Sequence, residues 1–184
     1  MTKNWTVLIT SLLILSSFSV VVAKGQDAGK DEKRRLYDET KKFSIIPPPG
    51  WDNEPKTKGR NAILAKQSGL ADNFSNFNVR EVKGDGKPPA LKELADAIIQ
   101  QGQQKTPGFV LDEKAELTIN GHPAYFMFFA HEQGPGNIKL KAATYMIASP
   151  NNSTYVVTFT LTPTVYERLK PAVKASASTI KLTK

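Results

Sequence analysis

ELTINGHPAYFMFF, residues 116–129, decides the fold of this chain. Two strand-like runs meet at Asn120-Gly121, the two-residue signal of a type I′ hairpin, whose positive φ angles match the twist of paired strands. The run 125–129 is apolar at every position, so we expect a central strand that is covered on both faces. The stretch therefore predicts a sheet with a layer of helix on each side.

The neighbouring segments extend this hairpin into a meander. Residues 109–119, 122–131, 137–149 and 154–161 are strand-like, and the turn signals at 120–121, 134–136 and 150–152 separate them. Upstream, residues 43–46, 61–66 and 77–82 predict three further strands, the first of them ended by the prolines at 47–49 because proline cannot continue a ladder.

Two helices are expected. The apolar positions of the first, at residues 91–104, recur at helical spacing: Leu91, Leu94, Ala95, Ile98 and Ile99. A second helix is predicted to start near Thr164, whose spacing to Glu167 fits a capping box, and Pro171 is expected to kink or restart it. The predicted fold class is therefore α+β, an antiparallel β-sheet meander flanked by helices as an α/β/α sandwich.

The N-terminal segment predicts export. Residues 5–23 carry no charge and are largely apolar, Lys3 precedes them, and Ala23 offers the small residue that signal peptidase requires. We expect a signal peptide at 1–23, cleaved after Ala23, and a periplasmic or extracellular protein. The alternative is an uncleaved anchor, since the run approaches the roughly 20 residues that span a bilayer. Residues 24–36, crowded with charges of both signs, predict a flexible tether before a single domain at 37–184.

The composition of the chain excludes several classes of protein. Of the 184 residues, 40% are hydrophobic and 23% are charged, which is typical of a soluble globular domain. No cysteine is present, so disulfides, thiolate metal sites and a lipid-anchor cysteine are excluded. The net charge of +8 is spread along the chain without interleaved aromatic residues, and we expect no nucleic-acid partner.

Residues that carry catalytic chemistry are scarce. His122 and His131 flank one predicted strand, and their odd spacing places them on opposite faces. Ser68 is not in a nucleophile-elbow motif, so we expect no catalytic residue, no metal, no cofactor and no enzymatic activity. A pair of carboxylates stays open, because acidic side chains distant in sequence can meet in a fold.

Several segments resemble a known family: the entry 37–51 with its proline-rich turn into Gly50-Trp51, NVREV at 78–82, INGHPAY at 119–125 and TYVVTF at 154–159. Together they resemble the PsbP-like domains, whose fold is shared by the DcrB-type bacterial envelope proteins and the Mog-type Ran-binding proteins. The resemblance implies this α+β fold and, with the signal peptide, an exported bacterial member. No metal-ligating motif of the photosystem II subunit is matched here, so the resemblance implies no cofactor.

These features favour an exported, non-catalytic binding or assembly module that acts at a membrane or envelope complex, as a monomer. Its partner would be an envelope or membrane-associated protein, with peripheral contact to anionic lipid also open. The candidate interaction surface is Trp51 with Lys56, Lys58 and Arg60, because an exposed aromatic residue beside basic residues is common in interfaces. For Trp51 the alternative is a plug at the end of the core. Two other hypotheses stay open. One is a protein that holds a small apolar or anionic ligand in a largely apolar cavity between sheet and helix, and the other is an envelope enzyme with a carboxylate pair.

Overall fold

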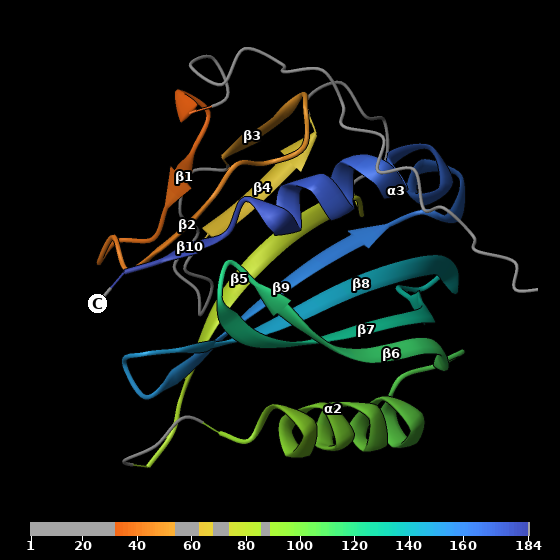
Figure 1. Ribbon diagram of the computed structural model, residues 1–184. Helices are drawn as coiled ribbons and strands as arrows, with labels where there is room; N and C mark the ends of the chain where they lie inside the picture. The colour runs from red at the N-terminus through yellow and green to blue at the C-terminus, as the bar shows by residue number, and fades with distance from the viewer. Residues whose placement is uncertain (1–31, 54–62, 68–73, 86–88, 184) are drawn as a thin grey trace, which may run out of the picture.

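A seven-stranded antiparallel sheet forms the middle layer of the protein (Figure 1). The computed structural model describes residues 32–53, 63–67, 74–85 and 89–183. In spatial order the strands are β3 (Trp51–Asn53), β4 (Ile63–Gln67), β5 (Asn76–Lys83), β9 (Ser153–Leu161), β8 (Ile138–Ser149), β7 (His122–Gln133) and β6 (Val110–Ile119). The four successive strands β6, β7, β8 and β9 pair consecutively, which confirms the predicted meander.

Helices cover both faces of this sheet. The helix α2 (Leu91–Lys105) lies on one face and α3 (Pro163–Ser178) on the other (Figure 1). A second, three-stranded sheet lies beside the C-terminal end of α3 and consists of β1 (Leu36–Tyr37), β2 (Phe43–Ile45) and β10 (Lys181–Leu182). The α+β class and the α/β/α layering are therefore confirmed.

The hairpin at Asn120-Gly121 has the geometry that the sequence predicts. Asn120 and Gly121 have φ angles of 48° and 83°, and Ile119 pairs with His122 across the turn. The strand β7 is covered on both faces, but it lies next to the edge of the sheet and not at its centre. The central place belongs to β9, because β5 adds to the free side of β9 and extends the sheet by three strands.

The sheet separates two hydrophobic cores of unequal size. The smaller core lies under α2 and includes Ala95, Ile99 and Met127. The larger core lies on the α3 face and is rich in aromatic residues; its fully buried members include Phe43, Phe77, Tyr155 and Phe159. Alternate residues of the buried strands face the two cores, since successive side chains of a strand point to opposite sides.

The start of α3 differs from the prediction. The helix begins at Pro163, its N-cap residue Thr162 makes no side-chain capping bond, and Glu167 pairs with Lys141 of β8 at 2.7 Å. The predicted capping box is therefore wrong. Pro171 is solvent-exposed and the helix continues through it to Ser178, so the predicted restart is also wrong. A proline removes one backbone donor, and the helix retains its packing on the sheet.

The folded domain begins before Tyr37. Arg35, which the sequence analysis placed in the flexible tether, is only 8% exposed. Its guanidinium donates to Glu32 Oε2 at 2.7 Å and to the carbonyl oxygen of Thr179 at 2.8 Å. A run of charge looks solvated in a sequence, yet an arginine is buried readily when its donors are all used. The predicted signal peptide and the cleavage site at Ala23 lie outside the described residues.

Candidate functional site

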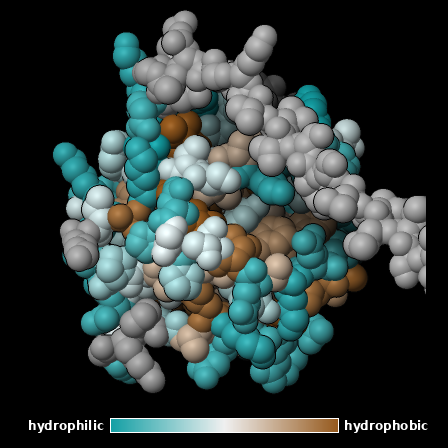
Figure 2. All heavy atoms as spheres, viewed as in Figure 1, coloured by the Kyte–Doolittle hydropathy of each residue, from teal (hydrophilic) through white to brown (hydrophobic). Residues whose placement is uncertain are grey.

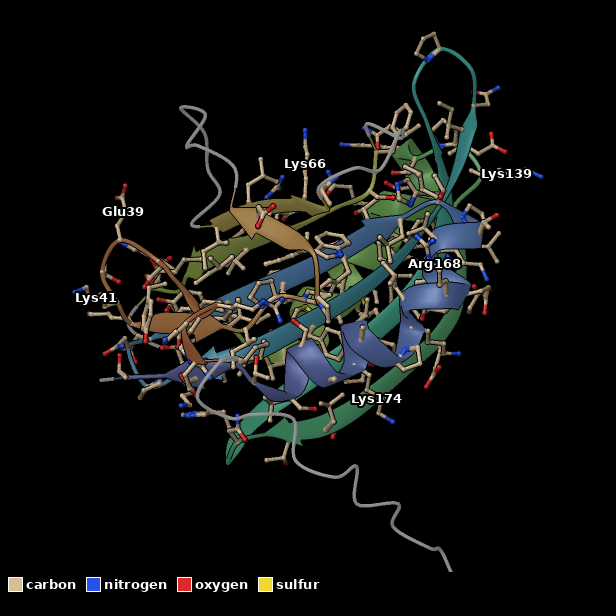
Figure 3. The ribbon with its side chains drawn as sticks, turned by 90° about the horizontal axis from the view of Figure 1, so that it is seen from above. Glu39, Lys41, Lys66, Lys139, Arg168 and Lys174 are labelled. Atoms are coloured by element: carbon tan, nitrogen blue, oxygen red, sulfur yellow. The ribbon has the colours of Figure 1, made fainter. Side chains whose placement is uncertain are left out.

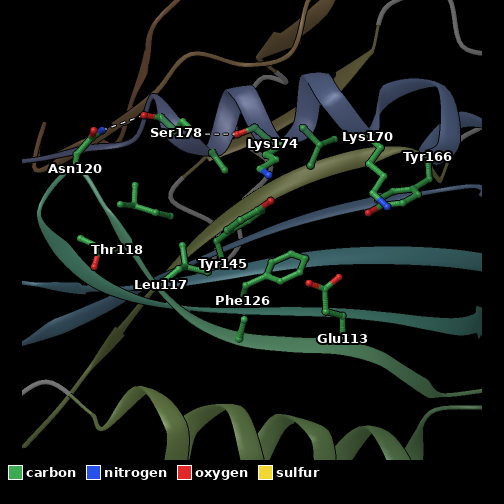
Figure 4. Close-up of a pocket in the computed structure, with 14 residues that line it drawn as sticks. Glu113, Leu117, Thr118, Asn120, Phe126, Tyr145, Tyr166, Lys170, Lys174 and Ser178 are labelled. Atoms are coloured by element: carbon green, nitrogen blue, oxygen red, sulfur yellow. Dashed lines mark hydrogen bonds between the residues drawn. The ribbon is translucent and has the colours of Figure 1, made fainter. Parts of the chain in front are cut away.

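A pocket lies between α3 and the β6 side of the sheet (Figure 4). Its volume is about 540 Å³, within the range of roughly 300 to 1,000 Å³ that is usual for small-molecule sites. Its walls are α3, one face of β6, and the strands β7 and β8 that form the floor. Its lining residues include Glu113, Ala115, Phe126, Tyr145, Lys170 and Lys174.

The helical wall follows from the spacing of its residues. Tyr166, Lys170 and Lys174 recur every fourth position, and Val173 and Ala177 lie on the same stripe. Residues four apart share one face of a helix. Buried Val173 and Ala177 hold α3 on the sheet, while the two exposed lysines carry positive charge at the rim of the pocket.

The strand wall is formed by alternate residues of β6. Glu113, Ala115 and Leu117 share one face, because side chains of a strand alternate. Ala115 is small and exposed, so the middle of this wall leaves space that a larger side chain would fill. Figure 2 shows apolar side chains open to the surface in this region, between polar side chains on either side.

Aromatic side chains form the floor. The rings of Phe126 and Tyr145 lie 5.0 Å apart between centroids, and Tyr145 also meets Phe159 edge-on at 6.3 Å. Tyr145 is 8% exposed and reaches the core at its base. The floor therefore offers flat apolar area that is fixed by packing from below.

Each end of the pocket is closed by specific contacts. At one end the Asn120 side-chain amide donates to the carbonyl oxygens of Ser178 and Ile180, at 3.1 and 2.6 Å. At the other end Phe128 stacks on Tyr166 with centroids 4.7 Å apart, and the ammonium of Lys141 lies 5.5 Å from the Tyr166 ring. These contacts hold α3 at both ends and leave the pocket open between them.

The polar groups of the pocket include two neutral tyrosine hydroxyls and two lysines that form no ion pair with described residues. Burial, with smaller contributions from Tyr166 and Glu113, raises the pKa of Tyr145 to about 12. Burial likewise raises the pKa of Tyr166. Both hydroxyls are therefore protonated at neutral pH and available as donors. Among the described residues, no ion pair involves Lys170 or Lys174 and no hydrogen bond involves the Tyr145 hydroxyl.

One member of the interaction surface predicted from the sequence, Trp51, is buried. Trp51 is 3% exposed and packs on Phe77 with ring centroids 5.9 Å apart, so it belongs to the core and offers no exposed aromatic surface. The alternative reading of Trp51 as a plug is the one the burial supports. The other three members, Lys56, Lys58 and Arg60, lie outside the described residues.

The two histidines occupy different environments on opposite sides of β7. His131 packs on Phe129 at 5.7 Å, and its buried Nδ1 has no hydrogen-bond partner among the described residues. Burial lowers the pKa of His131. Within the part of the chain that the structure describes, no group of three or more His, Asp or Glu side chains is placed to hold a metal ion.

Charged side chains elsewhere are dispersed over the surface. Seen from above, Lys66 and Lys139 point outward from distant parts of the molecule, and Glu39 and Lys41 point outward from a third part (Figure 3).

In residues 32–53, 63–67, 74–85 and 89–183, neither helix is long and apolar enough to cross a membrane.

Sequence reasoning left an apolar cavity between sheet and helix open as an alternative but named none of the pocket residues, although one signal for them was present. Lysines at 170 and 174 stand on the same stripe as the apolar residues of α3, where an amphipathic helix usually carries only core positions. Lysine stems can lie along apolar surface while their charged heads stay in water, so these two positions agree with the edge of an apolar site.

Comparisons with known proteins agree on the architecture. No family model matches the chain, and no curated protein matches it. Among solved structures, cyanobacterial PsbP from Synechocystis superposes with a TM-score of 0.59 at 12% identity, covering 81% of this chain and 91% of that one. The chain has the PsbP-like fold.

Two further structures share this PsbP-like fold. LpqN of Mycobacterium tuberculosis, described as involved in cell envelope biogenesis, superposes with a TM-score of 0.57 at 13% identity, covering 87% of this chain and 98% of that one. Protein PA94 of Pseudomonas aeruginosa, of unknown function, superposes with a TM-score of 0.53 at 15% identity, covering 73% and 98%. At these identities the likeness concerns the fold alone.

Proposed function

We propose that this chain is an exported, non-catalytic binding protein that serves as an accessory module of the bacterial cell envelope. The observation that carries the proposal is the aromatic pocket between α3 and β6. A mostly apolar cavity with a few convergent polar groups is the usual form of a ligand site. The structural likeness to LpqN and to cyanobacterial PsbP supports the envelope and accessory parts of the proposal.

The pocket favours a small-molecule ligand over docking through the surface predicted from the sequence. That surface depended on an exposed Trp51, and Trp51 is buried. The pocket, in contrast, is built from described residues of four elements and is held open by contacts at both ends. On this proposal the protein first binds its small ligand and then contacts an envelope partner, as an accessory module would.

The same site gives less support to the hypothesis that the chain is an envelope enzyme with a pair of catalytic carboxylates. Glu113 is the one acidic residue among those that line the pocket. Among the described residues, the acidic groups with a displaced pKa are Glu32, Asp96 and Glu167. They lie at the surface, and hydrogen bonds from basic partners lower the pKa of each. A general acid needs a raised pKa, which none of these groups has.

Native mass spectrometry of the exported protein tests the proposal. The full chain is secreted by a bacterial host, incubated with an extract of its envelope, and examined for bound small molecules. We expect an adduct with the wild type and none with Ala115→Trp, whose indole would occupy the pocket. The matched control is Ala97→Trp, on the exposed side of α2, which should keep the adduct.

Three outcomes would count against the proposal. An adduct that survives Ala115→Trp places the ligand elsewhere, and no adduct at all removes the binding role. Turnover of an envelope component by the purified protein would overturn the non-catalytic part. Export is tested on the same sample, because N-terminal sequencing should show a first residue of Lys24; a retained Met1 in the membrane fraction would refute cleavage.

A further inference from the structure

We propose that the α3–β6 pocket takes an amphipathic organic anion, with its apolar body on the aromatic floor and its acidic head between Lys170 and Lys174. This inference rests on the proposed binding function and names the chemical class of the ligand. The three observations that carry it are the shape of the floor, the state of the two lysines and the balance of charge at the rim.

The floor and inner wall suit an apolar body. Phe126 and Tyr145 present their rings to the cavity, and Leu117 and Val173 line it from the two facing walls. A flat ring or an extended chain placed there gains contact with surfaces that are already fixed by the core beneath them. The cavity of about 540 Å³ has room for a body of that kind.

Donor groups stand above the floor, and in Figure 4 Lys170 points toward Tyr166 while Lys174 points toward Tyr145. Lys170 and Lys174 stand one turn apart on α3 and have no ion-pair partner among the described residues. In Figure 4 the side chains of Lys174 and Tyr145 enter the pocket from facing walls and point toward each other. Two ammonium groups and a phenol hydroxyl form a suitable set of donors for a carboxylate or a similar acidic head.

The net charge at the rim of the pocket favours an anionic ligand. Lys141, at the end of the pocket, is already paired with Glu167 at 2.7 Å, so these two charges offset each other. Two lysines then face one carboxylate, Glu113, on the opposite wall. A cationic ligand would meet a net positive rim, and a neutral apolar ligand would gain no attraction from the two lysines, which are exposed at the rim.

Three probes with the same dodecyl chain and different heads distinguish these cases: dodecanoate, dodecan-1-ol and dodecylammonium. Their affinities are measured by isothermal titration calorimetry with the mature protein, below the concentrations at which the probes aggregate. We expect dodecanoate to bind at least about tenfold more tightly than the alcohol, and dodecylammonium to bind most weakly. The preference for dodecanoate should shrink as salt is added, because the lysines are exposed at the rim.

Variants assign the head group to its residues. The double variant Lys170→Gln/Lys174→Gln should lose about tenfold in affinity for dodecanoate and change little for dodecan-1-ol. Glu113→Gln should act in the opposite direction and strengthen dodecanoate binding about twofold. The matched control is Lys105→Gln/Lys139→Gln, which removes the same charge from exposed positions outside the pocket and should leave the affinity for dodecanoate unchanged.

The outcomes separate this inference from the proposed function. Equal binding of the three probes, all abolished by Ala115→Trp, would overturn the anionic class and keep the pocket as a ligand site. Equal losses in the control and pocket double variants would also overturn it, since the effect would then come from net charge. If no probe binds while an envelope adduct sensitive to Ala115→Trp is present, the amphipathic class is wrong and the binding function stands.

Discussion

The side-chain amide of Asn120 donates a 2.6 Å hydrogen bond to the carbonyl oxygen of Ile180, and so ties the β6–β7 hairpin to the segment that follows α3. Asn120 serves two purposes at once. It adopts the positive φ that the turn requires, and its amide holds the C-terminal end of α3 over the pocket. The hairpin signal in the sequence therefore also locates one end of the proposed ligand site.

Substitutions at Asn120 should separate its two roles. Asn120→Gly keeps the positive φ and loses the amide, so we expect a loss of about 1 kcal/mol in the free energy of unfolding. Asn120→Ala adds the cost of a left-handed conformation for a residue with a Cβ, and should lose about 2 kcal/mol in total. Urea denaturation measures both. If the two variants are equally stable, the turn conformation carries no cost at this site.

Phe128 should be among the most sensitive core positions of β7. It is 9% exposed and stacks on Tyr166, so truncation removes contacts to both the sheet and α3. We expect Phe128→Ala to lower the free energy of unfolding by roughly 3 to 5 kcal/mol. Val110→Ala is the control, because Val110 is 55% exposed at the start of β6 and should cost less than about 0.5 kcal/mol. A midpoint that barely moves for Phe128→Ala would contradict the stacking role.

Regular patterns in the sequence predicted the parts of the fold that depend on local periodicity. The alternation of β5 and the helical spacing of α2 give their bounds to within a residue or two. The strands β1 and β10 have two residues each, too few for any pattern, and they form only because β2 lies between them. The pocket depends on how α3 lies across the sheet, which spacing along one chain segment does not encode.

Arg35 should stabilise the fold from a segment that the sequence alone suggested was unstructured. Its side chain is nearly buried, is paired with Glu32, and donates to the Thr179 carbonyl at 2.8 Å. We expect Arg35→Ala to lower the free energy of unfolding by about 2 kcal/mol, the scale of lost charge-assisted hydrogen bonds. The control Arg168→Ala removes an exposed arginine of α3 and should change stability by less than about 0.5 kcal/mol. Equal losses of stability in Arg35→Ala and Arg168→Ala would indicate that residues 32–36 belong to the flexible tether and not to the folded domain.

His131 should make stability depend on pH. Burial disfavours its charged form, so its folded pKa lies below the unfolded value of about 6.5. The unfolded chain then binds more protons, and wild-type stability should fall as the pH drops below about 6.5 towards the folded pKa. In His131→Gln this part of the fall should be absent. Urea titrations between pH 8 and pH 5 test this, and identical profiles for the wild type and His131→Gln would contradict it.

Gly102 lies inside α2, where glycine is unfavourable, and its place is explained by Phe109. A Cβ at position 102 would stand 2.5 Å from Cε2 of Phe109, whose ring also packs on Phe129 at 5.0 Å. Alanine is favoured over glycine in a helix by about 1 kcal/mol, but here it must displace that ring. We therefore expect Gly102→Ala to lower the free energy of unfolding by about 1 to 2 kcal/mol.

The same substitution in a Phe109→Ala background is the decisive control for Gly102. With the ring gone, the added methyl group meets no obstacle, and Gly102→Ala should raise the free energy of unfolding by about 1 kcal/mol, as helix propensity alone requires. The sign of the effect thus reverses between the two backgrounds, and a double-mutant cycle by urea denaturation measures the coupling. If Gly102→Ala stabilises both backgrounds equally, the Phe109 ring moves aside at no cost in the free energy of unfolding. The close packing between α2 and the start of β6 would then not explain the glycine.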